Sequence, residues 1–486
     1  GYDKFMDGRK NFGNSNIGFY SLADDNVEYA IQALPFDRDE QVIRLGYITT
    51  GNTSHTVKLE QLENLSEYIA VYLHDKYENE TIDLRAQSTY SFESEQGTFN
   101  DRFEIIFEKP EITLTTWTGE ISDKWNETEN WDSGIPDIFT EARIPKGSVK
   151  ADGTIRAYKI VLGSEADLTL KESVSAEVTD SVILKSDAFN KARLLDLSNQ
   201  ELKGKIEYLA SEKDRDYFIS KPVRKASASM FGESNENPGM LEGYVKLFEY
   251  KNEPLRIFEA ATSLENLSGY IFNNYRSDYS LSFEGKINTG KIIREFDSEG
   301  AYLLGNPYPS DLNWGTKGEA AGWEGINTLR PSLWYINRDN NTNIAAYNRL
   351  SGIGVNAGSP VIPPMSAVWV LAETAGTITV DNAAREIALS DNKASNNYQG
   401  VRLTVNANEL SDETVVFFGS GHTGLDDYDT EKMFAAATNL PQIHTVSDSD
   451  KPLAINAYGP IDKHEIPVFF TSAQGGTFTM SAQVNN

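Results

Sequence analysis

Three carboxylates gather on one turn near the C-terminal end of the chain. Asp426, Asp427 and Asp429 lie within four residues, shortly after Gly424. Ca²⁺ takes six to eight oxygen ligands, so acidic side chains placed this closely together are what a Ca²⁺ site needs. The alternative is a solvated turn in which the Asp side chains hydrogen-bond to their own backbone. Ca²⁺ at this turn is the one cofactor that the sequence suggests.

A second polar cluster follows an aromatic side chain. Asn337, Asp339 and Asn341 come shortly after Trp334, in the segment 337–343. Amide and carboxylate groups beside an aromatic ring suit contact with a sugar. The same residues also suit a plain turn, because Asn and Asp tolerate left-handed backbone conformations. Both interpretations stay open at this point.

The chain carries none of the motifs that mark common enzyme sites. It has no Gly-x-Ser-x-Gly, no P-loop and no His-Glu-x-x-His. It also has no Cys, which excludes thiol nucleophiles, disulfides and Cys-ligated zinc. His74 and Asp75 are adjacent in a predicted strand, where neighbouring side chains point to opposite faces, so they are poorly placed for a catalytic triad. We therefore expect no enzymatic activity.

The charge excludes another class of function. The 486 residues include 44 Lys and Arg against 72 Asp and Glu, which gives a net charge of −28. Nucleic-acid binding needs a basic stripe, and the basic residues here are scattered. No run approaches the roughly 18 apolar residues that a membrane-spanning helix requires. We expect neither nucleic acid nor membrane insertion.

Short alternating or apolar runs recur along almost the whole chain. Each is rich in Val, Ile, Thr, Tyr and Phe and is bounded by Gly, Asn, Asp or Pro, which is typical of strands. The clearest runs are 41–48, 68–73, 103–107, 244–250, 279–283, 368–371, 401–405, 415–418 and 476–480. Only 429–437 suggests a helix, and a short one. The pattern predicts an all-β protein with several β-sandwich domains, Ig-like or jelly-roll-like, in tandem.

The two ends of the chain resemble each other. The segment 424–429 with Lys432 resembles 1–5 with Arg9, 454–457 matches 30–33, and 466–480 corresponds to 43–57. All of these matches keep an offset of 423–424 residues. A constant offset over several blocks favours an internal repeat over chance similarity between two β-rich segments.

The two copies begin and end at different points of the repeat. The C-terminal copy starts earlier, with the strands 401–405 and 415–418, whereas the N-terminal copy continues further, through 103–107. Four domains are predicted: an incomplete sandwich at 1–111, a small Trp-rich unit at 112–165, a larger sandwich at 166–386 and a second incomplete copy at 387–486. Half a sandwich exposes strand edges. We therefore expect one period of something longer, either part of a larger polypeptide or a subunit completed head to tail by strand addition.

The expected closure interface consists of apolar residues from the two ends. Residues i, i+2 and i+4 of a strand share a face, and on that basis two sets are predicted to pack together. The C-terminal set is Val401, Leu403, Val405, Val415 and Phe417. The N-terminal set is Ile31, Leu45, Tyr47, Tyr72, Phe103, Ile105 and Phe107.

The unit 112–165 holds three Trp within fifteen residues, namely Trp117, Trp125 and Trp131. Large rings anchor small β cores, and this interpretation is favoured over a platform on which a sugar stacks. A second landmark is Gly-Asn-Pro-Tyr-Pro-Ser at 305–310. Its two Pro residues fix an extended backbone and Tyr308 is expected to bury its ring, so this segment is predicted to be structural.

Several segments resemble those of large surface proteins of Bacteroidota. They are the "GNPYPS" block at 305–310 with Trp314, the Pro363-Pro364 strand that ends in Trp369-Val370-Leu371, the unit with Trp117, Trp125, Asn130-Trp131 and Pro136, the segment Asn100-Asp101-Arg102-Phe103, and 424–429 with Lys432-Met433. The last two resemble the closing strand and the opening of a domain that often precedes a type IX secretion sorting signal. The resemblance implies export, an extracellular or cell-surface location, and β-domains in series in adhesins or filaments.

The function expected from these observations is structural and adhesive. The chain would be a segment of a secreted, surface-exposed filament or giant adhesin, completed by copies of itself or by flanking repeats. The alternative is a carbohydrate-binding module that serves a polysaccharide-degrading system and contacts cell-surface glycans. That alternative needs an exposed aromatic row, for which the candidates are Trp117, Trp125, Trp323 and Trp334.

Overall fold

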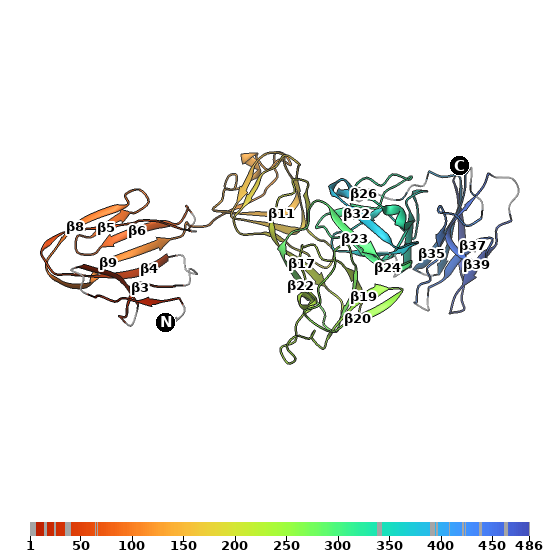
Figure 1. The fold of residues 1–486 in the computed structure, drawn as a ribbon. Helices are drawn as coiled ribbons and strands as arrows, with labels where there is room; N and C mark the ends of the chain where they lie inside the picture. The colour runs from red at the N-terminus through yellow and green to blue at the C-terminus, as the bar shows by residue number, and fades with distance from the viewer. Residues whose placement is uncertain are drawn as a thin grey trace. The chain divides into compact units, whose positions relative to one another are not determined.

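The chain folds into two compact units in a computed structural model, Gly1–Ile112 and Thr113–Asn486 (Figure 1). The structure describes residues 6–13, 17–23, 26–34, 40–63, 65, 67–337, 343–388, 394, 397–407, 409–419, 422, 424–436, 440–460 and 465–485. Nearly all regular structure in these residues is strand. The helical segments are single 3₁₀ turns: η1 (Thr128–Asn130), η2 (Ala228–Phe231), η3 (Ile326–Thr328) and η4 (Asn382–Ala384). The predicted all-β class with several sheets is confirmed. Across these same residues, no helix has the length and hydropathy to cross a membrane.

The first unit is an antiparallel sandwich. Its larger sheet has the order β1 (Gly8–Arg9), β3 (Glu28–Ile31), β2 (Ile17–Leu22), β4 (Glu40–Thr49), β9 (Gly97–Glu108), β6 (Ala70–Asp75) and β7 (Glu80–Asp83). The smaller sheet pairs β5 (Thr53–Lys58) with β8 (Thr89–Ser94). Alternating apolar side chains from both sheets form its core, which is built around Tyr47, Phe92 and Phe103.

The second unit begins with parallel strands stacked as in a β-solenoid. β10 (Thr113–Thr116), β11 (Thr140–Ala151), β13 (Lys159–Leu170), β15 (Val182–Leu184) and β17 (Lys203–Ala210) pair in this order, all parallel. β16 (Arg193–Asp196) joins β13, and β12 (Ile155–Ala157) pairs with β14 (Ala176–Val178), again in parallel. Each coil brings the chain back to stack on the previous one, so no helix is needed between parallel strands.

This stack corrects the predicted boundary between 165 and 166. The boundary falls inside β13, whose two halves pair with the two halves of β11. The Trp-rich unit is therefore the start of the stack. Its Trp117, Trp125 and Trp131 are all buried, with edge-to-face ring contacts at 4.9–5.1 Å, and Trp131 Nε1 donates to the Trp125 carbonyl at 2.8 Å. The predicted core role of these rings is confirmed.

The middle of the second unit contains three further sheets. β22 (Tyr279–Lys286) closes the parallel stack by pairing antiparallel with β17. The largest sheet runs β18 (Tyr217–Ile219), β21 (Tyr270–Asn274), β19 (Val245–Lys251), β24 (Gly300–Gly305), β31 (Ala367–Ala372), β27 (Leu329–Asn337), β28 (Asn343–Asn348) and β29 (Ile353–Val355), with β20 (Glu253–Ile257) beside β19. The two small sheets are β23 (Ile292–Phe296), β32 (Gly376–Val380) and β26 (Trp323–Glu324), and β30 (Val361–Ile362), β25 (Asp311–Asn313) and β33 (Arg385–Glu386).

The GNPYPS segment is a buried connection between β24 and β25. Asn306 Nδ2 donates to the carbonyls of Ser310, Ile362 and Pro363 at 2.8–3.0 Å, and its Oδ1 accepts the Tyr308 amide at 2.9 Å. Tyr308 is fully buried, and the Arg385 guanidinium lies 4.4 Å from its ring centroid. The predicted structural role of this segment is confirmed.

The last sheet of the second unit comes from 400–485. Its order is β39 (Val468–Thr471), β37 (Gln442–Val446), β38 (Pro452–Tyr458), β35 (Leu410–Phe418), β34 (Gly400–Ala407) and β40 (Thr479–Asn485). β36 (Thr430–Glu431) also pairs with β38, so the short helix expected over 429–437 is wrong. β39 and β40 are consecutive in sequence but lie at opposite ends of the strand order.

Candidate functional site

The last sheet and the first unit are two copies of one strand arrangement. Three strands of the first unit pair in the order β3-β2-β4, and three strands of the last sheet pair in the order β38-β37-β39. The opposed residues agree when the numbers are shifted by 423 or 424. The matched pairs are Ser21–Tyr29 with Thr445–Leu453, Ser21–Leu45 with Thr445–Val468, and Phe19–Tyr47 with Ile443–Phe470. Register is specific where one face is buried, so this agreement shows a repeat in the fold as well as in the sequence.

The repeat also extends to one of the acidic residues. Asp7 Oδ1 accepts the Ala33 amide at 2.7 Å, and Asp429 Oδ1 accepts the Ala457 amide at the same distance. Sequence alignment at an offset of 423 would place Met6 opposite Asp429. The structure corrects this alignment. The residues just before β1 and β36 correspond at an offset of 422, so Asp7 is the counterpart of Asp429.

Each copy exposes apolar side chains that the other copy buries. Four equivalent positions differ in the exposed fraction of the side chain. They are Leu45 at 9% against Val468 at 41%, Tyr47 at 1% against Phe470 at 41%, Ile31 at 66% against Ile455 at 0%, and Phe19 at 41% against Ile443 at 0%. Neighbouring strands account for part of this difference, and Ile455 also packs in a cluster with Trp334, Ala346 and Ile353 of the middle region. β4 pairs with β9 on its far edge and β38 pairs with β35, whereas among the described residues β39 has no strand corresponding to β9 and β3 none corresponding to β35.

The predicted closure residues do not share one face. β34 and β35 pair Arg402 with Val415 and Leu403 with Thr414. Alternation therefore places Val401, Leu403 and Val405 on the face opposite to Val415 and Phe417. The prediction that all five C-terminal residues share one face is wrong. It combined odd-numbered residues of β34 and β35, but the register places each odd-numbered residue of one strand opposite an even-numbered residue of the other.

Val415 and Phe417 already have partners within the second unit. They are buried in a cluster with Trp334, Ala346, Ile353, Val355, Tyr398, Ala454, Ile455 and Ala457. Trp334 Nε1 donates to the Glu431 carbonyl at 3.0 Å, which links β27 of the middle region to β36. This face of the last sheet is therefore an internal interface.

The N-terminal closure residues mostly belong to the core of the first unit. Leu45, Tyr47 and Phe103 are buried there, and Ile105 and Phe107 pack against them in part. Two other members of the predicted set lie outside this core. Tyr72 is half-buried and Ile31 is largely exposed.

A buried ion pair fastens the last sheet to the middle region. Lys432 Nζ contacts both oxygens of Asp412, at 2.7 and 2.5 Å, and both side chains are almost fully buried. Asp412 also accepts from Asn343 Nδ2, Asn356 Nδ2 and the Ile443 amide at 2.8–3.1 Å. Asp412 thus accepts five hydrogen bonds from four donor groups in three parts of the chain. Burial lowers the pKa of Lys432 and Asp412 opposes that shift.

The carboxylates of Asp426 and Asp429 in the acidic turn already accept hydrogen bonds from groups of the protein. Asp426 accepts from the Tyr428 amide and from His422 Nδ1, at 2.8 and 3.0 Å, and Asp429 accepts the amides of Ala457 and Asp426. Burial raises the pKa of Asp429 to about 6. The part of the chain that the structure describes holds no group of three acidic, His or Cys side chains able to bind a metal. Asp426, Asp427 and Asp429 therefore do not converge as the Ca²⁺ prediction requires.

The four Trp residues considered for sugar contact do not form an exposed surface. Trp117, Trp125, Trp323 and Trp334 are all buried, so the exposed aromatic row that was considered for them is wrong. Asp339 and Asn341 lie outside the described residues, as does the side chain of Asn337. His74 and Asp75 point apart, as predicted: His74 Nδ1 bonds Thr81 Oγ1 at 3.0 Å, and Asp75 is buried.

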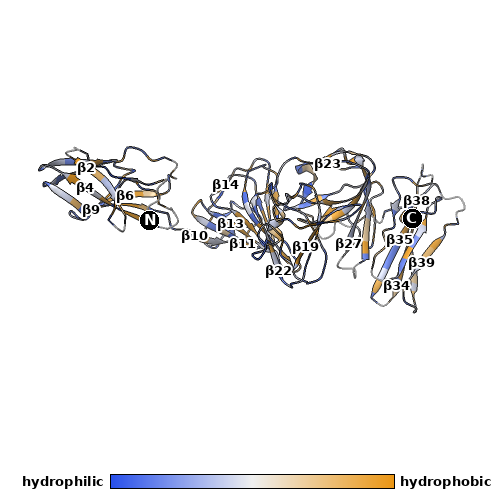
Figure 2. Ribbon diagram, turned by 60° about the horizontal axis from the view of Figure 1, so that its bottom comes forward, coloured by the Kyte–Doolittle hydropathy of each residue, from blue (hydrophilic) through white to orange (hydrophobic). Residues whose placement is uncertain are grey.

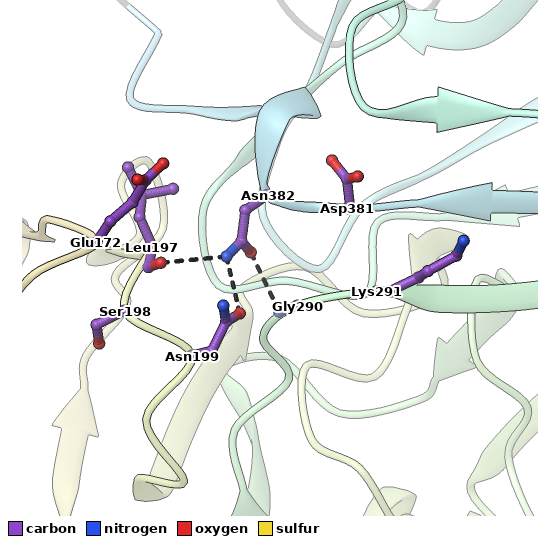
Figure 3. Close-up of a pocket in the computed structure, with 8 residues that line it drawn as sticks. All are labelled: Glu172, Leu197, Ser198, Asn199, Gly290, Lys291, Asp381 and Asn382. Atoms are coloured by element: carbon purple, nitrogen blue, oxygen red, sulfur yellow. Dashed lines mark hydrogen bonds between the residues drawn. The ribbon is translucent and has the colours of Figure 1, made fainter.

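A polar hollow of about 380 Å³ lies beside the parallel stack (Figure 3). It is lined by Glu172, Leu197, Ser198, Asn199, Gly290, Lys291, Asp381 and Asn382. Asn382 sits at its centre and uses its whole amide. Nδ2 donates to Asn199 Oδ1 and the Leu197 carbonyl, and Oδ1 accepts the Gly290 amide and Arg385 Nη1. These bonds hold three segments together.

The comparisons with known proteins give one match. A family model described as a domain of unknown function, DUF8693, matches the chain over residues 1–107 and 116–484. The chain belongs to this family. The gap between the matched segments contains the boundary between the two compact units of this family member. No curated protein and no solved structure gives a significant match.

Sequence reasoning missed two features of the last sheet, a buried ion pair and an exposed edge strand. The Asp412–Lys432 pair was not foreseen, although Lys432 is part of the repeated block. The exposure of β39 was not foreseen either, although the run Val468-Phe469-Phe470 has no alternating polar residue, which was the available signal. The candidate functional surface is therefore formed by the edge strands β39 and β40 of the last sheet and their exposed apolar residues. The ribbon of β39 is coloured as hydrophobic in Figure 2.

Proposed function

We propose that this chain is a non-enzymatic, structural and adhesive segment of a secreted, surface-exposed filament or giant adhesin that is built from repeated β-domains. The observation that supports this proposal best is the complementarity of the two repeat copies. Each exposes apolar positions whose counterparts are buried in the other. Completion by neighbouring repeats or subunits would bury both sets. Its partners are then copies of itself or flanking repeats.

Two further observations agree with a structural role. The strongly bonded polar groups, such as Asn306, Asn382 and Asp412, hold segments of the fold together. The net charge of −28 keeps an elongating assembly soluble through mutual repulsion. Neither observation favours the carbohydrate-binding alternative.

The proposal predicts self-association through the open edge. The apparent molar mass of the purified chain, measured by light scattering, should rise with concentration. Negative-stain images of the same sample should show regular rods. Phe470→Lys should suppress this growth, because a charge on an edge strand opposes pairing with another strand. The matched control is Ile293→Lys. Ile293 is also an exposed apolar residue, but it lies on β23, outside both repeat copies.

The control variant is expected to associate like the unmodified chain. A chain that stays monomeric up to the highest attainable concentration would contradict the proposal. Equal association of both Lys variants would also contradict it, because growth would then be independent of β39.

A further inference from the structure

We infer that β39 and β40 are the docking edges for one specific occupant: strands of the β8–β9 kind from the second half of another repeat copy. This inference rests on the proposed function and names the partner of the same surface. The occupant follows from the first unit, where the counterparts of both edges are already covered. β9 pairs with β4, the counterpart of β39, and β8 pairs with β5, the counterpart of β40.

The side chains at the edge lack the neighbours that these strands would supply. In the first unit, the ring of Tyr47 contacts Phe92 at 5.2 Å, Phe99 at 4.9 Å and Phe103 at 5.8 Å between centroids. All three rings come from β8 and β9. Among the described residues, its counterpart Phe470 has the equivalent of the Tyr47–His55 contact, a ring contact with Phe478 at 4.9 Å, and Phe470 is 41% exposed.

Both edge strands carry exposed apolar residues. Val468, Phe469 and Phe470 on β39 and Met480 and Val484 on β40 are each at least two-fifths exposed. Scattered exposed apolar residues are ordinary, but several of them along strand edges that are unpaired among the described residues mark an interaction surface. Strand addition satisfies the backbone groups of such edges, while alternating side chains of the added strands cover the exposed apolar residues.

The repeat also sets the register of docking. In the first unit, Thr56 lies opposite Ser91, and their hydroxyls are 2.9 Å apart. Thr479 is the counterpart of Thr56, so the docked strand should place its Ser91 opposite Thr479. Both positions are exposed and polar, which makes them suitable for substitution.

Disulfide trapping tests this register, since the chain has no Cys of its own. The full chain with Thr479→Cys is mixed with a synthetic peptide of residues 64–112 that carries Ser91→Cys, under mild oxidation. The control peptide carries Glu93→Cys instead. A disulfide needs Cα atoms within about 7 Å, and a shift of two residues along a strand exceeds that limit, so we expect at least roughly tenfold more cross-link with Ser91→Cys. Exchange of the peptide into the first unit gives no cross-link, because Thr56 is unchanged.

Three results would overturn the inference: no cross-link, equal yields from the two peptides, or an undiminished yield when Phe470→Lys is added to the Thr479→Cys chain. The light-scattering experiment separates this failure from failure of the proposed function. If the chain still assembles in a way that depends on Phe470 but does not cross-link in the expected register, the proposed function stands. In that case the inference that strands of the β8–β9 kind dock at this edge fails.

Discussion

Replacing Lys432 by Met is expected to lower the free energy of unfolding of the second unit by about 3–5 kcal/mol, the usual cost of removing one member of a buried ion pair. The substitution leaves the Asp412 carboxylate buried without its cation, although three other groups still donate to it. Because Asp412 also bonds Asn343 and Asn356 of the middle region, the last sheet should separate from that region first.

Tryptophan fluorescence during urea unfolding measures this effect, since all seven Trp belong to the second unit. Trp334 lies at the affected interface. The matched control is Lys451→Met, which removes an exposed ion pair with Glu431 and should cost about 1 kcal/mol or less. Equal midpoints for Lys432→Met and the unmodified chain would contradict the anchoring role of the pair.

Replacing Arg102 by Met should destabilise the first unit by a similar amount, about 3–5 kcal/mol. Arg102 Nε and Nη2 bond both oxygens of the buried Asp75 at 2.8–3.1 Å, and Nη1 bonds the Glu93 carbonyl at 2.9 Å. The guanidinium also lies 4.6 Å from the ring centroid of Phe92, so it joins β9 to β6 and β8. Hydrogen exchange of the β6 and β9 amides reports the loss, because the first unit has no Trp.

The same pair predicts an acid-sensitive first unit. Burial alone would raise the pKa of Asp75, but hydrogen bonds from Arg102, the Tyr77 amide and Tyr90, together with the charge of Arg102, bring it below its ordinary value. Burial and the Asp75 hydrogen bond raise the pKa of Tyr90 to about 12, which fits a charged Asp75. A carboxyl whose folded pKa is depressed stabilises the fold above its unfolded pKa of about 3.9, and this stability is lost as the pH falls through the folded value.

Protection of β9 should therefore fall as the pH is lowered below about 4 in the unmodified chain. Lys76→Met, which removes the more exposed pair with Glu104, should keep both the protection and its pH dependence. If Arg102→Met is as protected as Lys76→Met at neutral pH, the pair does not support the fold.

Local sequence signals identified what depends on local pattern. The periodicity marked eight of the nine clearest strand runs where strands occur, and the size of Trp117, Trp125 and Trp131 indicated a core. The ninth run, 476–480, was placed too early, because β40 begins at Thr479, where pairing with β34 begins. Tyr308 was correctly expected to be buried, and the two flanking Pro residues fix the backbone that carries it.

Features that depend on distant pairing were not predictable in the same way. Parallel and antiparallel strands share one alternating pattern, so the stack from β10 to β17 was predicted as two parts, a small Trp-rich unit and a larger sandwich. The register between β34 and β35 decides which side chains share a face, and no local pattern gives it. The pairs Asp75–Arg102 and Asp412–Lys432 join residues 27 and 20 positions apart, and each depends on the fold around it.

The internal repeat was the most informative sequence signal, because it transfers structure from one copy to the other. It correctly indicated that the ends are related. The side chains proposed to close the domain were nevertheless grouped wrongly, since Val415 and Phe417 are occupied inside the second unit. Comparing equivalent positions in the two folded copies, rather than apolar residues in sequence, identifies β39 and β40 as the open surface.

The most direct test of the account joins the two halves of the repeat in one chain. Residues 64–112 are placed after Asn486, which corresponds to position 63 in the repeat, and hydrogen exchange and urea unfolding are measured on the fusion chain. If the two copies are complementary, the amides of β39, β40 and the added segment should be protected, and the fusion chain should stay monomeric. The same fusion with Phe103→Lys in the added segment should gain neither property, since the counterpart residue is fully buried in the first unit. An added segment that exchanges like an unfolded peptide, with β39 still unprotected, would contradict the claim that the copies are complementary parts of one repeated domain.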